Sequence, residues 1–120
     1  MNAVEIADRS GTRIAFLAEE RTRILLAGLA AGYGLPHECA SGTCGACRAT
    51  VVSGEVGCLW PEAPGRKLCR GPSDILMCQS VARGPVSLAL RGAFGPEPAP
   101  PAGWRAGTLT RLDLLTADIA

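Results

Sequence analysis

The sequence predicts a single domain of the α+β class, with strands before and after one helix in chain order. Three observations indicate this. A chain of 120 residues has room for one domain and a short appendage. Several short segments alternate between apolar and polar residues, as strands do, and one segment between them carries apolar residues at helical spacing. A loop rich in cysteine and small residues follows the helical segment.

The chain begins with a predicted β-hairpin, and the helix follows it. Residues 4–6 and 12–16 alternate in character, and residues 8–11 between them are typical of a turn. Thr22 is a residue type that caps helices. The apolar residues at helical spacing after it are Ile24, Leu25, Leu26, Leu29 and Ala30. Gly32 favours the end of the helix.

The remaining elements of the domain are predicted to be strands joined by loops. Residues 37–47 have neither helical nor strand periodicity and are expected to form a loop that wraps around a bound group. Residues 57–73 contain several prolines and glycines and are expected to be irregular. The expected strands are residues 48–52, the short apolar segment 75–78 and residues 86–90.

The C-terminal part is expected to lie outside this domain. Residues 1–94 form the predicted domain, and residues 95–103 contain four prolines in nine residues, which is typical of a semi-stiff linker. Residues 104–120 form a tail with one strand-like segment and no partner strand in the chain.

Charge and hydropathy exclude some classes of function. Twelve basic and eleven acidic residues give a net charge of +1, which argues against nucleic acid and against an anionic membrane surface as partners. The first ten residues carry charges and no long apolar run, so no signal peptide is expected. No stretch approaches the roughly 20 apolar residues of a membrane-spanning helix. We therefore expect a cytoplasmic protein.

Six cysteines are the main indication of function. Cytosolic thiols stay reduced, so clustered cysteines there more often bind metal than form disulfides. Cys39, Cys44 and Cys47 have the spacing C-x4-C-x2-C, and Cys78 follows after thirty intervening residues. This pattern is that of a plant-type [2Fe–2S] cluster, in which two irons bridged by two sulfides need four thiolates, two on each iron.

The fourth ligand has to be chosen among three cysteines. Cys78 ends the apolar segment Ile-Leu-Met, which can hold it rigidly beneath the loop. Cys58 and Cys69 lie in the segment expected to be irregular, and we interpret them as spare thiols. The predicted metal ligands are therefore Cys39, Cys44, Cys47 and Cys78.

Small residues of the cysteine loop are expected to contact the cluster. They let backbone N–H groups approach the sulfurs, and hydroxyl groups can add donors, both of which help to set the reduction potential. The residues expected to make these contacts are Ser41, Gly42, Thr43, Gly45 and Ala46.

Other uses of the cysteines explain fewer residues. A structural zinc site usually needs two close pairs of ligands, and only Cys44 and Cys47 form such a pair. A thioredoxin-like C-x2-C motif would leave Cys39 and the glycines unexplained. The C-x2-C-x2-C-x3-C run of bacterial [4Fe–4S] sites is absent from the sequence.

Two segments carry a resemblance to a known family. The run 35–55 (LPHECASGTCGACRATVVSGE) and the later ILMCQS around Cys78 resemble the ferredoxin domains of bacterial oxygenase reductases, the NADH reductase components of monooxygenases and dioxygenases. The likeness covers about residues 4–91. It implies a β-grasp fold, with a mixed sheet of four to five strands and one helix packed across it. Strand pairing itself does not follow from the residues.

The resemblance also implies a function. The tail 104–120 is similar to the first strand of the FAD-binding barrel that follows such domains, so FAD and NADH would bind in a missing C-terminal part. The chain would pass single electrons from that flavin reductase module to an oxygenase component. Two alternatives are a free-standing ferredoxin that serves separate proteins and a zinc-stabilised binding module without a redox role.

Three further residues are interpreted as ordinary. Arg48 beside Cys47 is expected to be solvated, Trp60 to cover the core, and His37 to be a plain loop residue.

Overall fold

The structure is a computed structural model that describes residues 1–95. The predicted linker beyond Gly95 and the predicted tail 104–120 lie outside the described residues. Within residues 1–95, no helix is long and apolar enough to cross a membrane. The elements in chain order are β1 (Asn2–Ala7), β2 (Arg13–Ala18), α1 (Ile24–Ala30), β3 (Arg48–Ser53), β4 (Val56–Cys58), the 3-10 helix η1 (Pro64–Leu68), β5 (Asp74–Leu76), the 3-10 helix η2 (Met77–Gln79), β6 (Ser80–Ala82) and β7 (Val86–Ala89).

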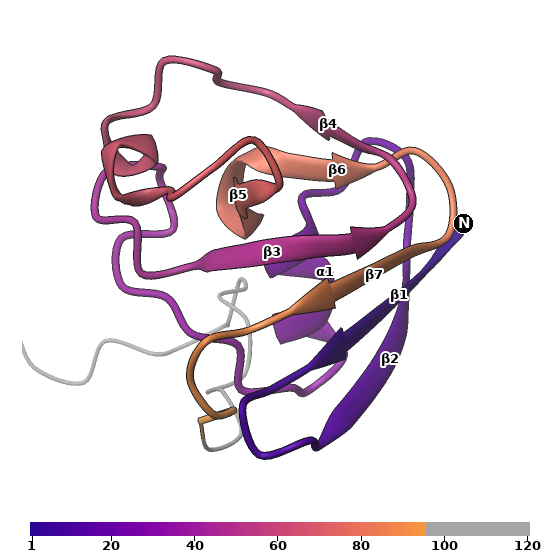
Figure 1. Ribbon diagram of the computed structural model, residues 1–120. Helices are drawn as coiled ribbons and strands as arrows, with labels where there is room; N and C mark the ends of the chain where they lie inside the picture. Colours follow the sequence, from indigo (N-terminus) through magenta and orange to yellow (C-terminus); the bar gives the residue numbers. More distant parts are fainter. Residues whose placement is uncertain (96–120) are drawn as a thin grey trace, which may run out of the picture.

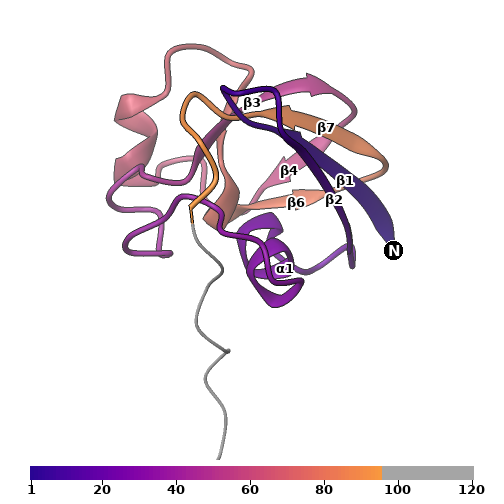
Figure 2. The same cartoon turned by 90° about the horizontal axis from the view of Figure 1, so that it is seen from below.

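Five strands form one mixed sheet in the order β2-β1-β7-β3-β5 (Figure 1). The central strand β7 runs parallel to β1 and antiparallel to β3, and the outer pairs β1–β2 and β3–β5 are antiparallel. Strands β4 and β6 form a second, two-stranded sheet. Helix α1 lies across one face of the main sheet (Figure 2). This arrangement confirms the β-grasp fold class.

The core lies between the sheet and α1. Alternate residues of β1, Val4 and Ile6, are fully buried, as the strand period requires. From α1, Ile24, Leu25 and Gly28 are buried. A Cβ atom at Gly28 would clash with the side chain of Leu35 and crowd the ring of Phe16, so the missing side chain lets α1 approach the sheet closely.

The hairpin, the helix, β3 and β7 confirm the sequence predictions, and four details differ. The strand predicted over residues 75–78 is β5, which ends at Leu76, so Cys78 lies in the 3-10 helix η2. The N-cap of α1 is Arg23 rather than Thr22, and no side chain caps the helix. The segment 57–73 is not wholly irregular, because it contains η1 and the end of β4. Strand β6 was not predicted from the sequence. Its three residues pair with β4, and Val81 also forms an isolated bridge with Arg23.

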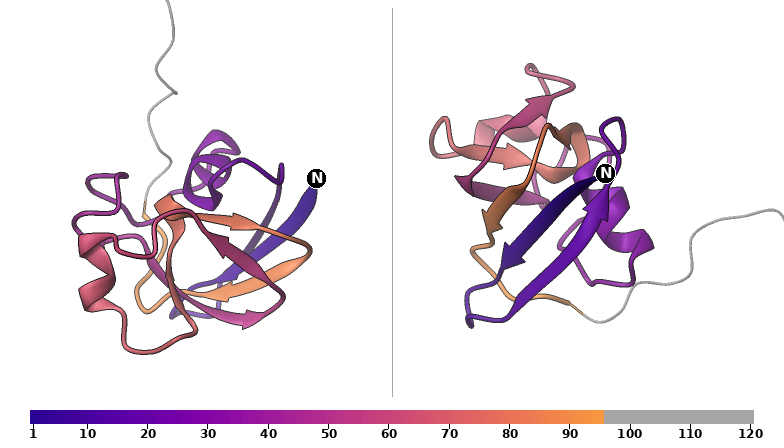
Figure 3. Two further views of the ribbon diagram at one scale, coloured as in Figure 1. Left: turned by 90° about the horizontal axis from the view of Figure 1, so that it is seen from above. Right: turned by 90° about the vertical axis from the view of Figure 1, so that its right-hand side faces the viewer.

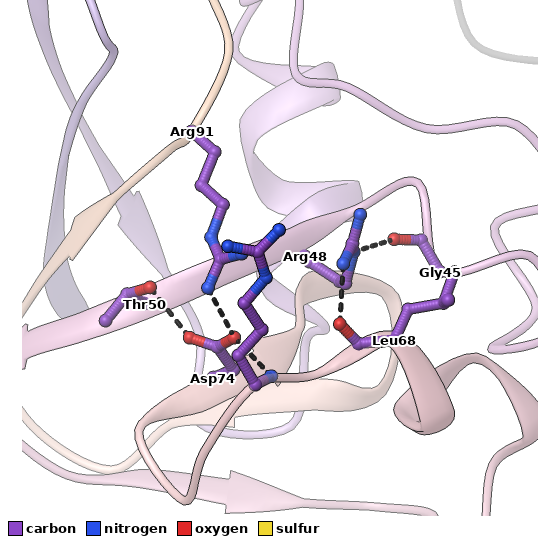
Figure 4. A network of polar contacts seen from close by, with 7 residues as sticks. Gly45, Arg48, Thr50, Leu68, Asp74 and Arg91 are labelled. Carbon is purple, nitrogen blue, oxygen red and sulfur yellow. Dashed lines mark hydrogen bonds and ion pairs between the residues drawn. The ribbon is translucent and has the colours of Figure 1, made fainter.

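A buried carboxylate ties the β3–β5 end of the sheet together (Figure 4). Asp74 in β5 accepts hydrogen bonds from the Thr50 hydroxyl of β3 at 2.8 Å, from the backbone N–H of Arg70 at 2.8 Å, and from the Arg91 guanidinium after β7 at 3.0 Å. The backbone N–H of Arg70, followed by the Thr50 hydroxyl and the Arg91 charge, holds the pKa of Asp74 below its usual value. The ionised carboxylate is therefore the form that the fold requires.

Replacing Asp74 with Asn is expected to lower the free energy of unfolding by about 1–3 kcal/mol at pH 7, because buried donors lose a charged acceptor. The folded-state pKa of Asp74 lies below its unfolded value near 3.8. Its stabilisation is therefore present above that value and lost as pH falls through the folded pKa. The difference in free energy of unfolding between wild type and Asp74→Asn should therefore become smaller in acid. Urea unfolding followed by circular dichroism measures it.

Glu5→Gln is the matched control, since the Glu5–Arg13 ion pair at 3.0 Å is exposed on both sides. Its effect is expected to stay below about 1 kcal/mol. An Asp74→Asn variant no less stable than Glu5→Gln would contradict the role assigned to the buried carboxylate.

Candidate metal centre

The cysteine loop connects the region after α1 to the start of β3 and turns by means of left-handed backbone conformations. Ala40, Gly42 and Gly45 have φ values of 53°, 87° and 75°. Glycine is required at two of these positions for space as well. A Cβ atom at Gly42 would lie 2.9 Å from Cγ of Gln79, and one at Gly45 would lie 3.0 Å from the carbonyl oxygen of Gly65. The loop is thus packed tightly on its inner side.

The 3-10 helix η1 forms a wall against the cysteine loop (Figure 3). The backbone N–H of Gly65 donates to the carbonyl oxygen of Gly42 at 2.8 Å. A Cβ atom at Gly65 would lie 2.8 Å from the backbone nitrogen of Gly45 and 2.9 Å from the Gly42 oxygen. Gly65 is therefore required for close packing against the cysteine loop, and the sequence did not single it out because it is one glycine in a segment with several.

The distant cysteine reaches the loop through η2. The backbone N–H of Met77 donates to the carbonyl oxygen of Cys47 at 3.0 Å, and the N–H of Cys78 donates to the Cys47 sulfur at 3.4 Å. Cys47 and Cys78 are buried, with exposed fractions of 3% and 1%, whereas Cys39 is exposed and Cys44 is half-buried. One end of the cysteine constellation therefore faces the core and the other faces solvent.

Backbone N–H groups point at three of the four sulfurs. The N–H groups of Ser41 and Cys44 both donate to the Cys39 sulfur at 3.3 Å, and the N–H of Ala46 donates to the Cys44 sulfur at 3.3 Å. With the Cys78–Cys47 bond, this makes four N–H···S contacts. Donors of this kind stabilise negative charge on sulfur, so the loop favours thiolates.

The exposed Cys39 and the buried Cys47 have pKa values shifted in opposite directions. The Ser41 hydroxyl, with the backbone N–H groups of Ser41, Cys44 and Thr43, lowers the pKa of Cys39 to about 5. Burial, together with the neighbouring thiols of Cys78 and Cys44, raises the pKa of Cys47 to about 12. Burial therefore favours the neutral Cys47 thiol, and a metal ion bound there would displace its proton.

The chemistry of the donor set fits a binuclear iron–sulfur centre. Such a centre takes two thiolates on each iron and completes the coordination with bridging sulfides, and four of the free cysteines lie in or next to the cysteine loop and η2. The residues present therefore suit a [2Fe–2S] cluster.

The other residues singled out from the sequence lie around this centre. Ser41 and Thr43 are exposed, with their hydroxyl oxygens 3.4 Å apart. His37 is exposed, and its Nδ1 lies 2.9 Å from the carbonyl oxygen of Leu35, so it contacts loop backbone. Trp60, 40% exposed, lies beside Gly42; it covers the cysteine loop and not the hydrophobic core, contrary to the expectation from the sequence.

The two remaining cysteines take no part in the N–H···S contacts. Cys58 is exposed on β4, where its sulfur lies 3.8 Å from an Arg66 guanidinium nitrogen. Cys69 is half-buried just after η1, and burial raises its pKa. Neither thiol accepts a backbone N–H bond from the cysteine loop within residues 1–95.

The interpretation of Arg48 from the sequence is wrong. Arg48 is half-buried rather than solvated, and its guanidinium donates to the carbonyl oxygens of Gly45 at 2.9 Å and Leu68 at 2.6 Å (Figure 4). No sequence pattern indicated these bonds, because both acceptors are backbone atoms.

Comparisons with known proteins agree with this geometry. A family model described as a 2Fe-2S iron-sulfur cluster binding domain matches residues 7–83. The ferredoxin–NAD(+) reductase component of the alkene monooxygenase system of Xanthobacter autotrophicus is 43% identical over 81 residues, which cover 65% of this chain and 24% of that protein. The ferredoxin–NAD(P)(+) reductase CarAd of Metapseudomonas resinovorans is 45% identical over 62 residues, which cover 49% of this chain and 18% of that protein.

A solved structure shows the same fold. The Amycolatopsis cytochrome P450 reductase GcoB aligns with a TM-score of 0.66 and 29% identity, over 83% of this chain and 29% of that chain. The present chain thus spans about a quarter or less of the length of the curated relatives it matches.

Gly65→Ala tests the contact between η1 and the cysteine loop. The added methyl group meets backbone atoms that cannot rotate away, so we expect the free energy of unfolding to fall by about 1–3 kcal/mol. Denaturant unfolding measures this loss.

Gly71→Ala is the matched control, because a Cβ atom at Gly71 meets nothing within 4 Å. It is expected to change stability by no more than about 0.5 kcal/mol. Equal stabilities of the two variants would refute close packing of η1 on the loop.

Proposed function

The chain belongs to the family of 2Fe-2S iron–sulfur cluster binding domains, and from this premise we propose that it is a one-electron carrier whose cluster is held by Cys39, Cys44, Cys47 and Cys78. The observation that carries the ligand assignment is the set of N–H···S contacts, which joins the cysteine loop to Cys78 through the Cys47 sulfur. When bound, the cluster supplies reversible uptake and release of single electrons.

The protein residues tune and shield this centre. The N–H donors of Ser41, Cys44, Ala46 and Cys78 offset the negative charge on the sulfurs, which increases when an electron is added. Burial of Cys47 and Cys78 excludes water from one side. The exposed Cys39 side is the short path for electrons between the cluster and a partner protein.

We place this domain, residues 1–94, in the NADH reductase component of an oxygenase system. Two observations support this proposal. The two relatives are named as a ferredoxin–NAD(+) reductase component and a ferredoxin–NAD(P)(+) reductase, and this chain covers only a small share of their length. In this proposal, residues 95–103 are a linker, and residues 104–120 are the start of an FAD-binding barrel. Electrons would come from NADH through a flavin and go to an oxygenase component. A reducing cytoplasmic location completes the proposal, because clustered thiols there stay available to bind metal.

Anaerobic purification followed by iron and sulfide assays tests the cofactor. We expect about two irons and two sulfides per chain, a rhombic electron paramagnetic resonance signal that appears on reduction with dithionite, and a midpoint potential of about −400 mV. Mixing the reduced protein with oxidised cytochrome c should transfer about one electron per chain. Zinc without iron would refute the redox function.

Single Cys→Ser substitutions test the ligand set. Each change at Cys39, Cys44, Cys47 or Cys78 should abolish or visibly alter the iron content and the absorption spectrum, because one iron loses a thiolate. Cys58→Ser and Cys69→Ser are the controls and should keep both properties. Loss of the cluster in either control, with Cys78→Ser unaffected, would reassign the fourth ligand.

A further inference from the structure

Arg48 forms a bridge between the cysteine loop and η1. Its Nε–H donates to the carbonyl oxygen of Gly45 at 2.9 Å, and its Nη1 donates to the carbonyl oxygen of Leu68 at 2.6 Å (Figure 4). Among residues 1–95, the ion pairs are Arg13–Glu5 and Arg91–Asp74, and Asp74 acts on Arg48 only at longer range, without an ion pair. Both hydrogen bonds of this half-buried guanidinium go to backbone carbonyl groups.

The Gly45 carbonyl belongs to a peptide unit that also contacts a sulfur. That peptide consists of the C=O of Gly45 and the N–H of Ala46, and this N–H donates to the Cys44 sulfur at 3.3 Å. A continuous chain of hydrogen bonds therefore leads from the Arg48 guanidinium through one peptide group to Cys44.

Such a chain strengthens its last bond. A charged donor on the carbonyl oxygen withdraws electron density from the peptide, which makes its N–H a better donor, and bonds in series polarise one another. A stronger N–H···S bond stabilises negative charge on sulfur, and the reduced cluster carries one more negative charge than the oxidised cluster. Reduction therefore becomes easier.

The second bond of Arg48 holds the peptide in place. Leu68 ends η1, and η1 packs on the loop through Gly65, so the bond to the Leu68 oxygen anchors the guanidinium to the wall of the site. The planar guanidinium can satisfy both carbonyls at once, which a single ammonium group cannot do with the same geometry.

We propose that Arg48 is a positioning residue that raises the midpoint potential of the cluster by polarising the Gly45–Ala46 peptide toward the Cys44 sulfur. This inference rests on the proposed function, because it requires the cluster on Cys44.

The test is a dye-mediated redox titration of iron-loaded variants. At a fixed applied potential, Arg48→Gln should lower the ratio of reduced to oxidised cluster by about three- to tenfold, where tenfold equals 59 mV for one electron. Arg48→Lys keeps the charge but not the two-carbonyl bridge, and should lower the ratio by at least about twofold. The iron content and the electron paramagnetic resonance spectrum of the reduced protein show whether each variant holds an intact cluster.

Lys67→Gln is the matched control, since it removes one positive charge from an exposed position of η1 next to Leu68. The ratio of reduced to oxidised cluster in this variant should change by less than about twofold, because an exposed charge is screened. A ratio for loaded Arg48→Gln within the range of this control would overturn the proposal.

If Arg48→Gln does not take up iron, Arg48→Lys tests the proposal instead. A ratio of reduced to oxidised cluster below that of wild type supports the proposal, and an unchanged ratio overturns it. A wild-type protein that contains no iron would instead overturn the proposed function and this inference with it.

Discussion

The short contact between Cys47 and η2 is the interaction on which the rest of the site depends. Two N–H groups of η2, those of Met77 and Cys78, donate to the carbonyl oxygen and the sulfur of Cys47. These bonds join segments thirty residues apart and seal the inner end of the cysteine loop against the core. Burial there raises the pKa of the Cys47 thiol, so binding to a metal ion would have to displace its proton.

The opposite end of the same loop is open, and this asymmetry suits electron transfer. Cys39 is exposed and accepts two backbone N–H bonds, which with the Ser41 hydroxyl lower its pKa. A centre whose one side is shielded and whose other side reaches the surface can exchange electrons without exposing its whole coordination shell to water. The β-grasp scaffold supplies this geometry, since β3 leads out of the loop and β5 leads into η2.

Backbone packing by η1 complements this arrangement. Gly65 brings η1 against Gly42 and Gly45, Arg48 bonds to both the loop and η1, and Asp74 fixes the neighbouring strand end. The contacts of η1 with the loop include backbone atoms, such as the hydrogen bond from Gly65 to Gly42, which no periodic pattern of side chains indicates. Backbone atoms leave few signs in a sequence, apart from glycines where a side chain would not fit.

Residue types and spacing alone determined the cofactor, the hairpin, the helix and the α+β class, and the resemblance to oxygenase reductase ferredoxin domains added the β-grasp fold. These features depend on local chemistry: thiolates at set intervals, strand and helix periods, and turn residues. Only the tertiary structure decided the strand order, the pairing of β4 with β6, the wall formed by η1 and the bridging position of Arg48. Each of these joins residues distant in sequence through backbone groups that every residue carries, so no pattern of side chains could have specified the partner.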